Sequence, residues 1–325
     1  MLQVASLVLP LFALILLGWV AGRLRRLPLE GLAWLNFFIV YVALPALFFR
    51  LLARTPVEEF ANGAFLVSTT LATFIVFVAG FAIALLARRG DTRVATIQGF
   101  AGAYGNIGYM GPPLAIAAFG PAAGVPVALV FCLDNAMHFT LAPLLMAVGA
   151  RQKKSGEDNQ NDPGESLSAV FGGIVRRIVL HPFIIATIAG MLAAVSEWQP
   201  AGALDALLLS LSNAAAPCAL FAMGVTAALR PLRRVPLELT WLIPMKLVVH
   251  PLVVYLLVSR LPGIDPVWLH AAVLLAALPS ATNVFVLAQQ YGVWEERASS
   301  AVVLSTLISI ITVTTFLYMV KAGAL

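Results

Sequence analysis

The chain consists of long apolar runs separated by short polar loops. Each run is close to the roughly 20 residues that an α-helix needs to cross the hydrocarbon core of a bilayer. The runs lack the polar–apolar alternation of a transmembrane β-strand. The pattern therefore predicts an all-α integral membrane protein with ten transmembrane helices. They are expected near residues 4–22, 31–52, 64–86, 93–118, 122–149, 170–195, 203–229, 236–258, 266–290 and 298–320.

The composition strengthens this prediction. Of the 325 residues, 61% are hydrophobic and only 11% are charged, with a mean hydropathy of +0.95. Soluble domains average about 45–50% apolar and about 25% charged residues, so this chain has too little polar surface for a soluble protein. An ordinary soluble enzyme and a nucleic-acid partner are excluded, and the lipid bilayer is the expected surrounding. Cys132 and Cys218 lie inside apolar runs and are interpreted as small buried residues.

The basic residues predict the orientation. Fifteen of the 20 Lys and Arg residues fall in the loops after the first, third, fifth, seventh and ninth runs, and four lie on the opposite side. Because Lys and Arg accumulate in cytoplasmic loops, both termini are expected on the non-cytoplasmic side. No basic segment precedes the first run, so this run is expected to be a retained helix and not a cleaved signal peptide.

Prolines recur at a fixed offset of 172 residues, which pairs Pro10 with Pro182 and Pro45 with Pro217. Each half would then hold five runs, and an odd number inverts the second half relative to the first. Secondary transporters commonly have this plan, although chance placement of prolines is the alternative. The expected domains are a first repeat at 1–150, a polar cytoplasmic linker at 151–169 and a second, inverted repeat at 170–325.

Two runs have features that unwind a helix. In the fourth run, glycines recur every three residues from Gly99 to Gly111 and precede Pro112, and the ninth run has Pro279 in its middle. A step of three residues turns a helix by about 300°, so these glycines share no packing face and instead make the backbone easy to unwind. Since proline lacks an N–H and clashes with the preceding turn, helix breaks are also expected at Pro45, Pro113 and Pro217.

Unwound backbone within a membrane is tolerated only inside protein or around a water-filled cavity. There, half-helix ends can offer N–H and C=O groups to a shared site. Asn106 and Asn283 lie at the expected breaks, and each amide can bind a polar substrate or satisfy its own broken backbone. The candidate substrate-binding residues are Gly105, Asn106, Gly108, Pro112, Pro279, Ser280, Thr282 and Asn283.

Two stretches resemble a known family. The GNIGYMGPP stretch from Gly105 to Pro113, the LPSATNVFVLAQQYG stretch from Leu278 to Gly292 and the order of ten runs resemble the auxin efflux carrier family. This family includes plant PIN-type carriers and bacterial carboxylate permeases, and it is related to bile acid/sodium symporters. The resemblance covers the whole chain. The central loop is shorter than in the plant carriers, so their phosphorylated regulatory loop is absent.

The resemblance has implications for architecture and mechanism. It implies that the fourth and ninth helices cross at their breaks, with the substrate at the crossing. It also implies a scaffold half and a transporter half that move as in an elevator, a homodimer through the scaffold half, and a place in the bacterial inner membrane.

Ionisable residues inside apolar runs are costly and therefore candidates for function. Asp134 and His138 are four residues apart in the fifth run and share a helix face. They could take up and release a proton or anchor the helix structurally. Lys246 in the eighth run could pair with Asp134, join an anion site or be structural. No cofactor or metal site is expected, and H⁺ and Na⁺ are both open as coupling ions, the latter on oxygen atoms near Ser280.

These features favour a secondary transporter of a small organic anion, driven by ion or substrate gradients. No P-loop pattern is present. A membrane enzyme would need a nucleophile with a base, and neither a GxSxG nor an HExxH motif occurs, so no catalytic residue is assigned. A sensor or structural protein that has the carrier fold without transport is the other alternative.

Overall fold

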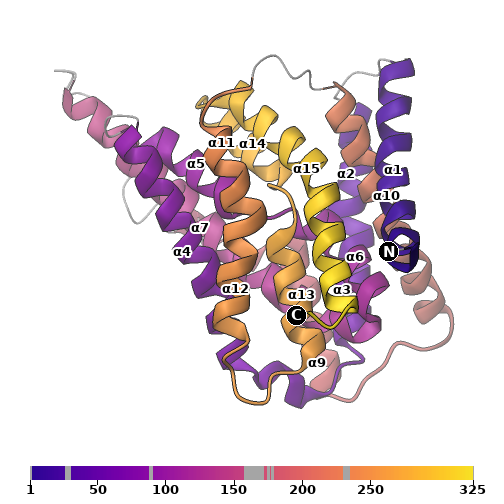
Figure 1. Cartoon of the computed structure of the whole chain (residues 1–325). Coiled ribbons are helices and arrows are strands. Elements are labelled where there is room, and N and C mark those ends of the chain that lie inside the picture. Colours follow the sequence, from indigo (N-terminus) through magenta and orange to yellow (C-terminus); the bar gives the residue numbers. More distant parts are fainter. Residues whose placement is uncertain are drawn as a thin grey trace.

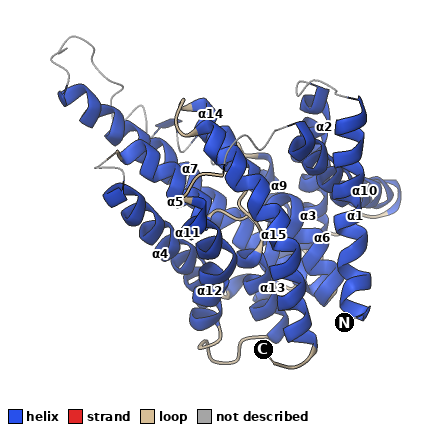
Figure 2. Cartoon of the chain, turned by 45° about the horizontal axis from the view of Figure 1, so that its top comes forward, coloured by secondary structure: helices blue, strands red, loops and turns tan. Residues whose placement is uncertain are grey.

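The computed structural model describes residues 2–25, 31–87, 91–156, 172–173, 176, 179–229 and 235–324. Within these ranges the regular structure is helical and no strand occurs, as Figure 1 and Figure 2 show. The prediction of an all-α chain is confirmed.

The first half contains seven α-helices together with shorter π and 3₁₀ segments. They are α1 (Leu2–Arg25), α2 (Leu32–Phe38), the π-helix η2 (Ile39–Ala43), α3 (Leu44–Leu52), the 3₁₀-helix η3 (Val57–Ala61), α4 (Gly63–Ala87), α5 (Thr92–Ala103), α6 (Ile107–Phe119), the 3₁₀-helix η4 (Pro121–Ala123) and α7 (Gly124–Gly156). Helix α7 continues for six residues into the expected linker 151–169, and the linker residues 157–169 lie outside the described ranges.

The second half has the same helical character. Its helices are α9 (Pro182–Val195), α10 (Gly202–Leu229), α11 (Leu239–Pro244), the π-helix η5 (Met245–Val249), α12 (His250–Val258), α13 (Pro266–Ala277), α14 (Thr282–Gln290) and α15 (Glu295–Lys321). The run expected at 170–195 is interrupted at His181, whose backbone is extended, and α9 begins at Pro182. The cause is local, because a residue before proline disfavours the helical region and proline suits the first position of a helix.

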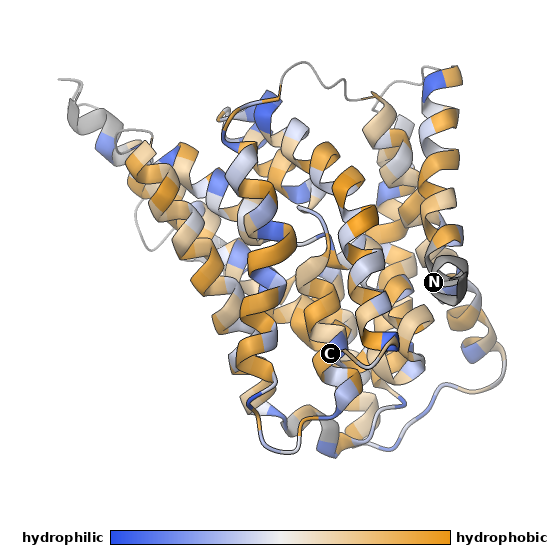
Figure 3. Ribbon diagram, in the orientation of Figure 1, coloured by the Kyte–Doolittle hydropathy of each residue, from blue (hydrophilic) through white to orange (hydrophobic). Residues whose placement is uncertain are grey.

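Six segments of the described chain are long and apolar enough to cross a membrane: Leu32–Leu52, Gly63–Ala87, Pro121–Ala150, Gly202–Leu229, Leu239–Val258 and Glu295–Lys321. Four shorter apolar helices accompany them: Leu9–Leu24, Ile107–Phe119, Pro182–Val195 and Pro266–Ala277. Each predicted run overlaps one of these segments. Large apolar side chains such as Leu86, Trp34 and Leu237 are more than 80% exposed, and Figure 3 shows apolar residues on the outer helices. Such a surface fits lipid and not water.

Three predicted helix breaks are wrong. Pro113 lies within α6 and Pro217 lies within α10, and both helices continue past them. Pro45 lies in the first turn of α3, directly after the π-helix η2. The wider π-turn accommodates the missing N–H of Pro45 without ending the helix. Membrane helices tolerate interior prolines because neighbouring groups satisfy the freed carbonyls.

The helices pack into two bodies. In the first body, α10 packs on α1, α2 and α3, and α9 packs on α3. In the second body, α4 packs on α5 and α12, α7 packs on α5, α6 and α13, and α15 packs on α13 and α14. Figure 1 shows α1 and α10 side by side at the right of the molecule, with α4 at the left. Fewer contacts join the two bodies than hold each together.

Glycines allow the backbones of α1 and α10 to come very close. A Cβ atom on Gly224 would lie 1.9 Å from the carbonyl oxygen of Ile15, and one on Gly18 would lie 2.1 Å from that of Phe221. Backbone oxygens cannot rotate away as side chains can, so only glycine fits at these two positions.

The substitution Gly224→Ala is therefore expected to destabilise the protein by about 1–3 kcal/mol, as overpacking usually does. The measurement is the midpoint of thermal unfolding in detergent. Gly63→Ala is the matched control, because a Cβ atom at this position would have no other atom within 4 Å and alanine favours a helix. Equal midpoints for the two variants would contradict the close approach of α1 and α10.

Candidate functional site

The fourth predicted helix is broken between α5 and α6. The side chain of Asp91 caps the start of α5 by accepting hydrogen bonds from the backbone N–H groups of Arg93 and Val94. At the other end, α5 stops at Ala103 because the backbone of Tyr104 is extended. The helix resumes as α6 only after Asn106.

The ninth predicted helix is broken between α13 and α14. Leu278 ends α13 with an extended backbone, since it precedes Pro279, and Ala281 is extended as well. Pro279 therefore marks a true break, unlike the interior prolines of α6 and α10. The residues Tyr104–Asn106 and Leu278–Ala281 are called the crossing below.

The two broken segments pair with each other. The backbone N–H of Asn106 donates to the carbonyl of Pro279, and that of Ala281 donates to the carbonyl of Tyr104, both at 2.8 Å. Gly105 and Ser280 form an isolated antiparallel bridge. The unwound backbone groups, which would otherwise lack hydrogen-bond partners, thus bond to each other. Unpaired backbone groups are not tolerated in the interior of a membrane.

Ser280 lies behind the crossing and not in a binding cavity. Its hydroxyl donates to the carbonyl of Ala101 at 2.6 Å, and its backbone N–H donates to the hydroxyl oxygen of Ser305 at 3.1 Å. The side chain therefore caps the end of α5. Pro112 and Pro279 also do not line the cavity described next, so these three predicted residues lie outside the walls of that cavity.

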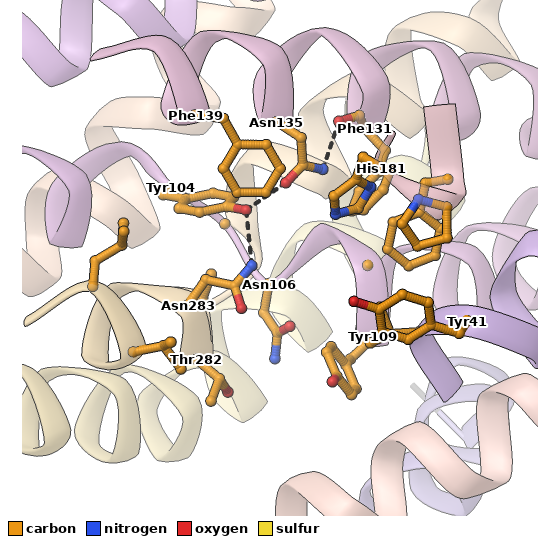
Figure 4. A pocket seen from close by; sticks show the side chains of 18 of the residues that line it. Tyr41, Tyr104, Asn106, Tyr109, Phe131, Asn135, Phe139, His181, Thr282 and Asn283 are labelled. Atoms are coloured by element: carbon orange, nitrogen blue, oxygen red, sulfur yellow. Dashed lines mark hydrogen bonds between the residues drawn. The ribbon is translucent and has the colours of Figure 1, made fainter. Parts of the chain in front are cut away.

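A cavity of about 670 Å³ opens at the crossing (Figure 4). It lies between the two bodies, since both bodies contribute to its walls. The second body supplies Tyr104, Gly105, Asn106, Gly108, Tyr109, Phe131, Asn135, Phe139, Ala281, Thr282, Asn283, Val286, Leu287 and Gln290. The other wall consists of Val40, Tyr41, Gly173, Arg176, Leu180, His181, Pro182 and Phe183. Five of the eight predicted substrate-binding residues therefore line it.

The amide nitrogens of Asn106, in the crossing, and Asn283, in the first turn of α14, do not bond to the broken backbone. The Asn106 Nδ2 donates to Met223 Sδ at 3.2 Å, which is a weak acceptor, and the Asn283 Nδ2 donates to the Tyr104 hydroxyl at 3.0 Å. Asn106 is only 3% exposed. These contacts leave its amide available for a better partner in the cavity.

Tyr104 and Asn135 were missed as site residues by sequence reasoning. The Tyr104 hydroxyl donates to Asn135 Oδ1 at 2.5 Å, and Asn135 Nδ2 donates to the carbonyl of Phe131 at 2.8 Å. With Asn283, these groups form a hydrogen-bonded chain from α14 through Tyr104 of the crossing to α7 (Figure 4). Their positions in the sequence could have identified them, since Tyr104 lies beside the glycine-rich break and Asn135 is a polar residue in an apolar run.

The electrostatics of the cavity favour an anion. The starts of α6 and α14 face it through Gly108, Tyr109, Thr282 and Asn283, and a helix start carries partial positive charge. Among the described lining residues, Arg176 is the one with a fixed charge, and no Asp or Glu is present.

Asp134 and His138 do not pair through their side chains. The Nδ1 atom of His138 bonds to the backbone carbonyl of Asp134, one turn earlier in α7. The ring of His138 stacks on Tyr104 with centroids 3.9 Å apart. The expected carboxylate–imidazole pair is therefore replaced by a ring that supports the wall of the cavity.

A buried polar chain links Asp134 to Lys246 instead. The Thr73 hydroxyl donates to Asp134 Oδ2 at 3.5 Å and lies 3.2 Å from His250 Nε2. On the far side of the ring, His250 Nδ1 lies 3.0 Å from Lys246 Nζ, which donates to the carbonyl of Ala276 at 2.5 Å. Lys246 is fully buried and stabilises the carbonyl end of α13.

No group of three or more His, Cys, Asp or Glu side chains suited to a metal occurs in the described part of the chain.

Comparison with known proteins gives consistent matches over almost the whole chain. A family model described as "Membrane transport protein" matches residues 3–317. A Rhizobium meliloti (strain 1021) protein named "Putative malonate transporter" is 53% identical over 327 residues, which cover 100% of this chain and 98% of that protein. An "Uncharacterized transporter" of Methanothermobacter thermautotrophicus is 28% identical over 316 residues, 94% of each chain.

Proposed function

Because the chain belongs to the membrane transport protein family, the family of the auxin efflux carriers, we propose that it is a secondary active transporter of a small organic anion. The substrate class is a carboxylate of the malonate or auxin type, in keeping with the name of the relative that is 53% identical. The observation that carries the proposal is the cavity at the crossing, which two helix starts and Arg176 make electropositive. Its relatives are named as transporters, so the chain is not an enzyme.

The architecture proposed for this function is two inverted repeats of five membrane helices, at 1–150 and 170–325, joined by the linker 151–169. The ten apolar segments, one in each predicted run, support it, as do the breaks in the fourth and ninth runs. Both termini are proposed to lie outside the cytoplasm of a bacterial cell. A membrane-impermeant thiol reagent should then label a cysteine introduced at either terminus in intact cells, and protection of both would reverse the orientation.

An elevator-type mechanism is proposed for the movement. The body of α1, α2, α3, α9 and α10 would stay fixed as a scaffold, and the body that contains the crossing would carry the substrate. The position of the cavity between the two bodies supports this division. The scaffold is also the proposed surface of a homodimer, which the mass of the purified protein in detergent would test.

The test of the transport proposal is counterflow of labelled malonate in proteoliposomes, which needs no ion gradient. Transient accumulation that unlabelled malonate abolishes is the expected result. A flat response across a panel of small carboxylates, from protein with an intact unfolding transition, would reject the proposed substrate class and favour the sensor or structural alternative.

Coupling to H⁺ or Na⁺ is proposed to involve Asp134 and Lys246, through the polar chain that also contains Thr73 and His250, and His138, which bonds to the backbone carbonyl of Asp134. Asp134→Asn is expected to retain counterflow, since exchange requires no net ion movement. The accumulation of substrate that an inward H⁺ or Na⁺ gradient drives should fall to the level that exchange alone produces without a gradient. Both gradients are to be applied to wild type and variant at equal substrate concentration. Undiminished gradient-driven accumulation by the variant would make the polar chain purely structural.

A further inference from the structure

The wall of the cavity opposite the crossing carries two polar side chains whose role in binding the substrate has not yet been specified. Arg176 and His181 both line the cavity from the segment that leads into α9. Figure 4 shows His181 and Tyr41 toward one side, Thr282 and Asn283 toward the other, and Asn106 between them. The two groups of polar residues thus face a shared space.

The backbone and the neighbouring rings position the His181 side chain, and a backbone hydrogen bond holds Arg176 in the same segment. His181 has an extended backbone before Pro182, and its ring contacts Phe139 and Phe183, with centroids 5.1 and 5.0 Å away. Its Nδ1 atom is buried and has no hydrogen-bond partner among the residues that the structure describes. The backbone at Arg176 is joined to that of Leu180, because the N–H of Leu180 donates to the carbonyl of Arg176 at 3.0 Å.

The chemistry of the two sides differs. The crossing offers amides and the partial charges of helix starts, whereas Arg176 offers a full positive charge and a planar donor pair that matches a carboxylate. Phe131 and Phe139 of α7 line the same cavity and provide an apolar surface that suits methylene groups. A ligand with one carboxylate would use the first side and leave the guanidinium without an anion.

We propose that Arg176 and His181 form a second anion subsite, and that the substrate is a short dicarboxylate held at both ends. One carboxylate lies at the crossing near Asn106, and the other lies between the guanidinium and the imidazole. This inference rests on the proposed function of the cavity as a carboxylate site. Because the second subsite belongs to the scaffold side, it makes selection for a dianion depend on both walls.

The experiment compares malonate with propionate, which has the same carbon chain and a methyl group in place of one carboxylate. Both compete with labelled malonate in counterflow by wild type, Arg176→Gln and Arg260→Gln. Wild type is expected to prefer malonate by about 10-fold or more, the scale of a charge-assisted pair. Arg176→Gln should lose most of that preference. Arg260→Gln is the matched control, since Arg260 is exposed and does not line the cavity.

Two further variants make the result specific. Arg176→Lys keeps the charge without the planar fork and should retain part of the preference, while His181→Asn should lower it less than Arg176→Gln does. The proposal is overturned by equal potency of malonate and propionate in wild type, or by an unchanged ratio in Arg176→Gln. Absence of counterflow for every acid with wild-type protein would instead reject the transport proposal itself. Thermal stabilisation by each acid gives the same ratio where a variant transports too slowly to assay.

Discussion

Asn106→Ala is expected to raise the half-saturating substrate concentration in counterflow by about 10- to 100-fold and to leave the protein folded. A hydrogen bond to a charged group contributes roughly 1.5–3 kcal/mol, and about 1.4 kcal/mol corresponds to a factor of ten in affinity. The folded state should tolerate the change, because the Asn106 side chain gives up only a weak contact with Met223 Sδ at 3.2 Å. The backbone hydrogen bond from Asn106 to Pro279 remains in the variant.

Asn283→Ala should have a comparable effect with an additional component. Its amide donates to the Tyr104 hydroxyl, so its removal also loosens the hydrogen bond between Tyr104 and Asn135. Asn213→Ala is the control for both variants, since Asn213 is an exposed asparagine in α10 that does not line the cavity. Wild-type saturation curves for both Asn106→Ala and Asn283→Ala would remove the crossing from the binding site.

The breaks at the crossing could be predicted from the sequence because their causes are local. Glycines around Gly105 make unwinding cheap, and Pro279 forces the residue before it out of the helix. The same reasoning failed at Pro113 and Pro217. A proline inside a helix removes one hydrogen bond, and whether the helix ends or merely adjusts depends on neighbours that lie elsewhere in the sequence.

The polar chain behind the crossing could not be predicted from local pattern. Thr73 and His250 are 177 residues apart, and from its sequence context His250 is only a residue before proline. The packing of α4 against α12 brings the two side chains together. The position of His138 has a similar explanation. A spacing of four residues places its ring over the preceding turn, and the backbone carbonyl there, not the carboxylate, is its partner.

Lys246→Met is expected to destabilise the protein by about 3–5 kcal/mol, the usual cost of leaving a buried charge without compensation. The ammonium of Lys246 is fully buried, donates to the carbonyl of Ala276 and is linked to Asp134 through His250 and Thr73. Without it, the carbonyl end of α13 and the Asp134 carboxylate both lose their positive partner. The unfolding midpoint in detergent should fall sharply, and counterflow should be lost because the crossing is no longer held. Lys321→Met, at the exposed end of α15, should leave both unchanged.

The double variant Lys246→Met with Asp134→Asn separates charge compensation from packing. If the two charges compensate each other, removing both should restore roughly half or more of the lost stability, because the uncompensated carboxylate is gone. If Lys246 acts only by filling space and capping α13, the effects of the two substitutions should add. Recovery of stability without recovery of counterflow would assign the ammonium a direct part in holding the crossing for transport. Additive destabilisation would show that Asp134 and Lys246 act independently, despite the Thr73–His250 connection between them.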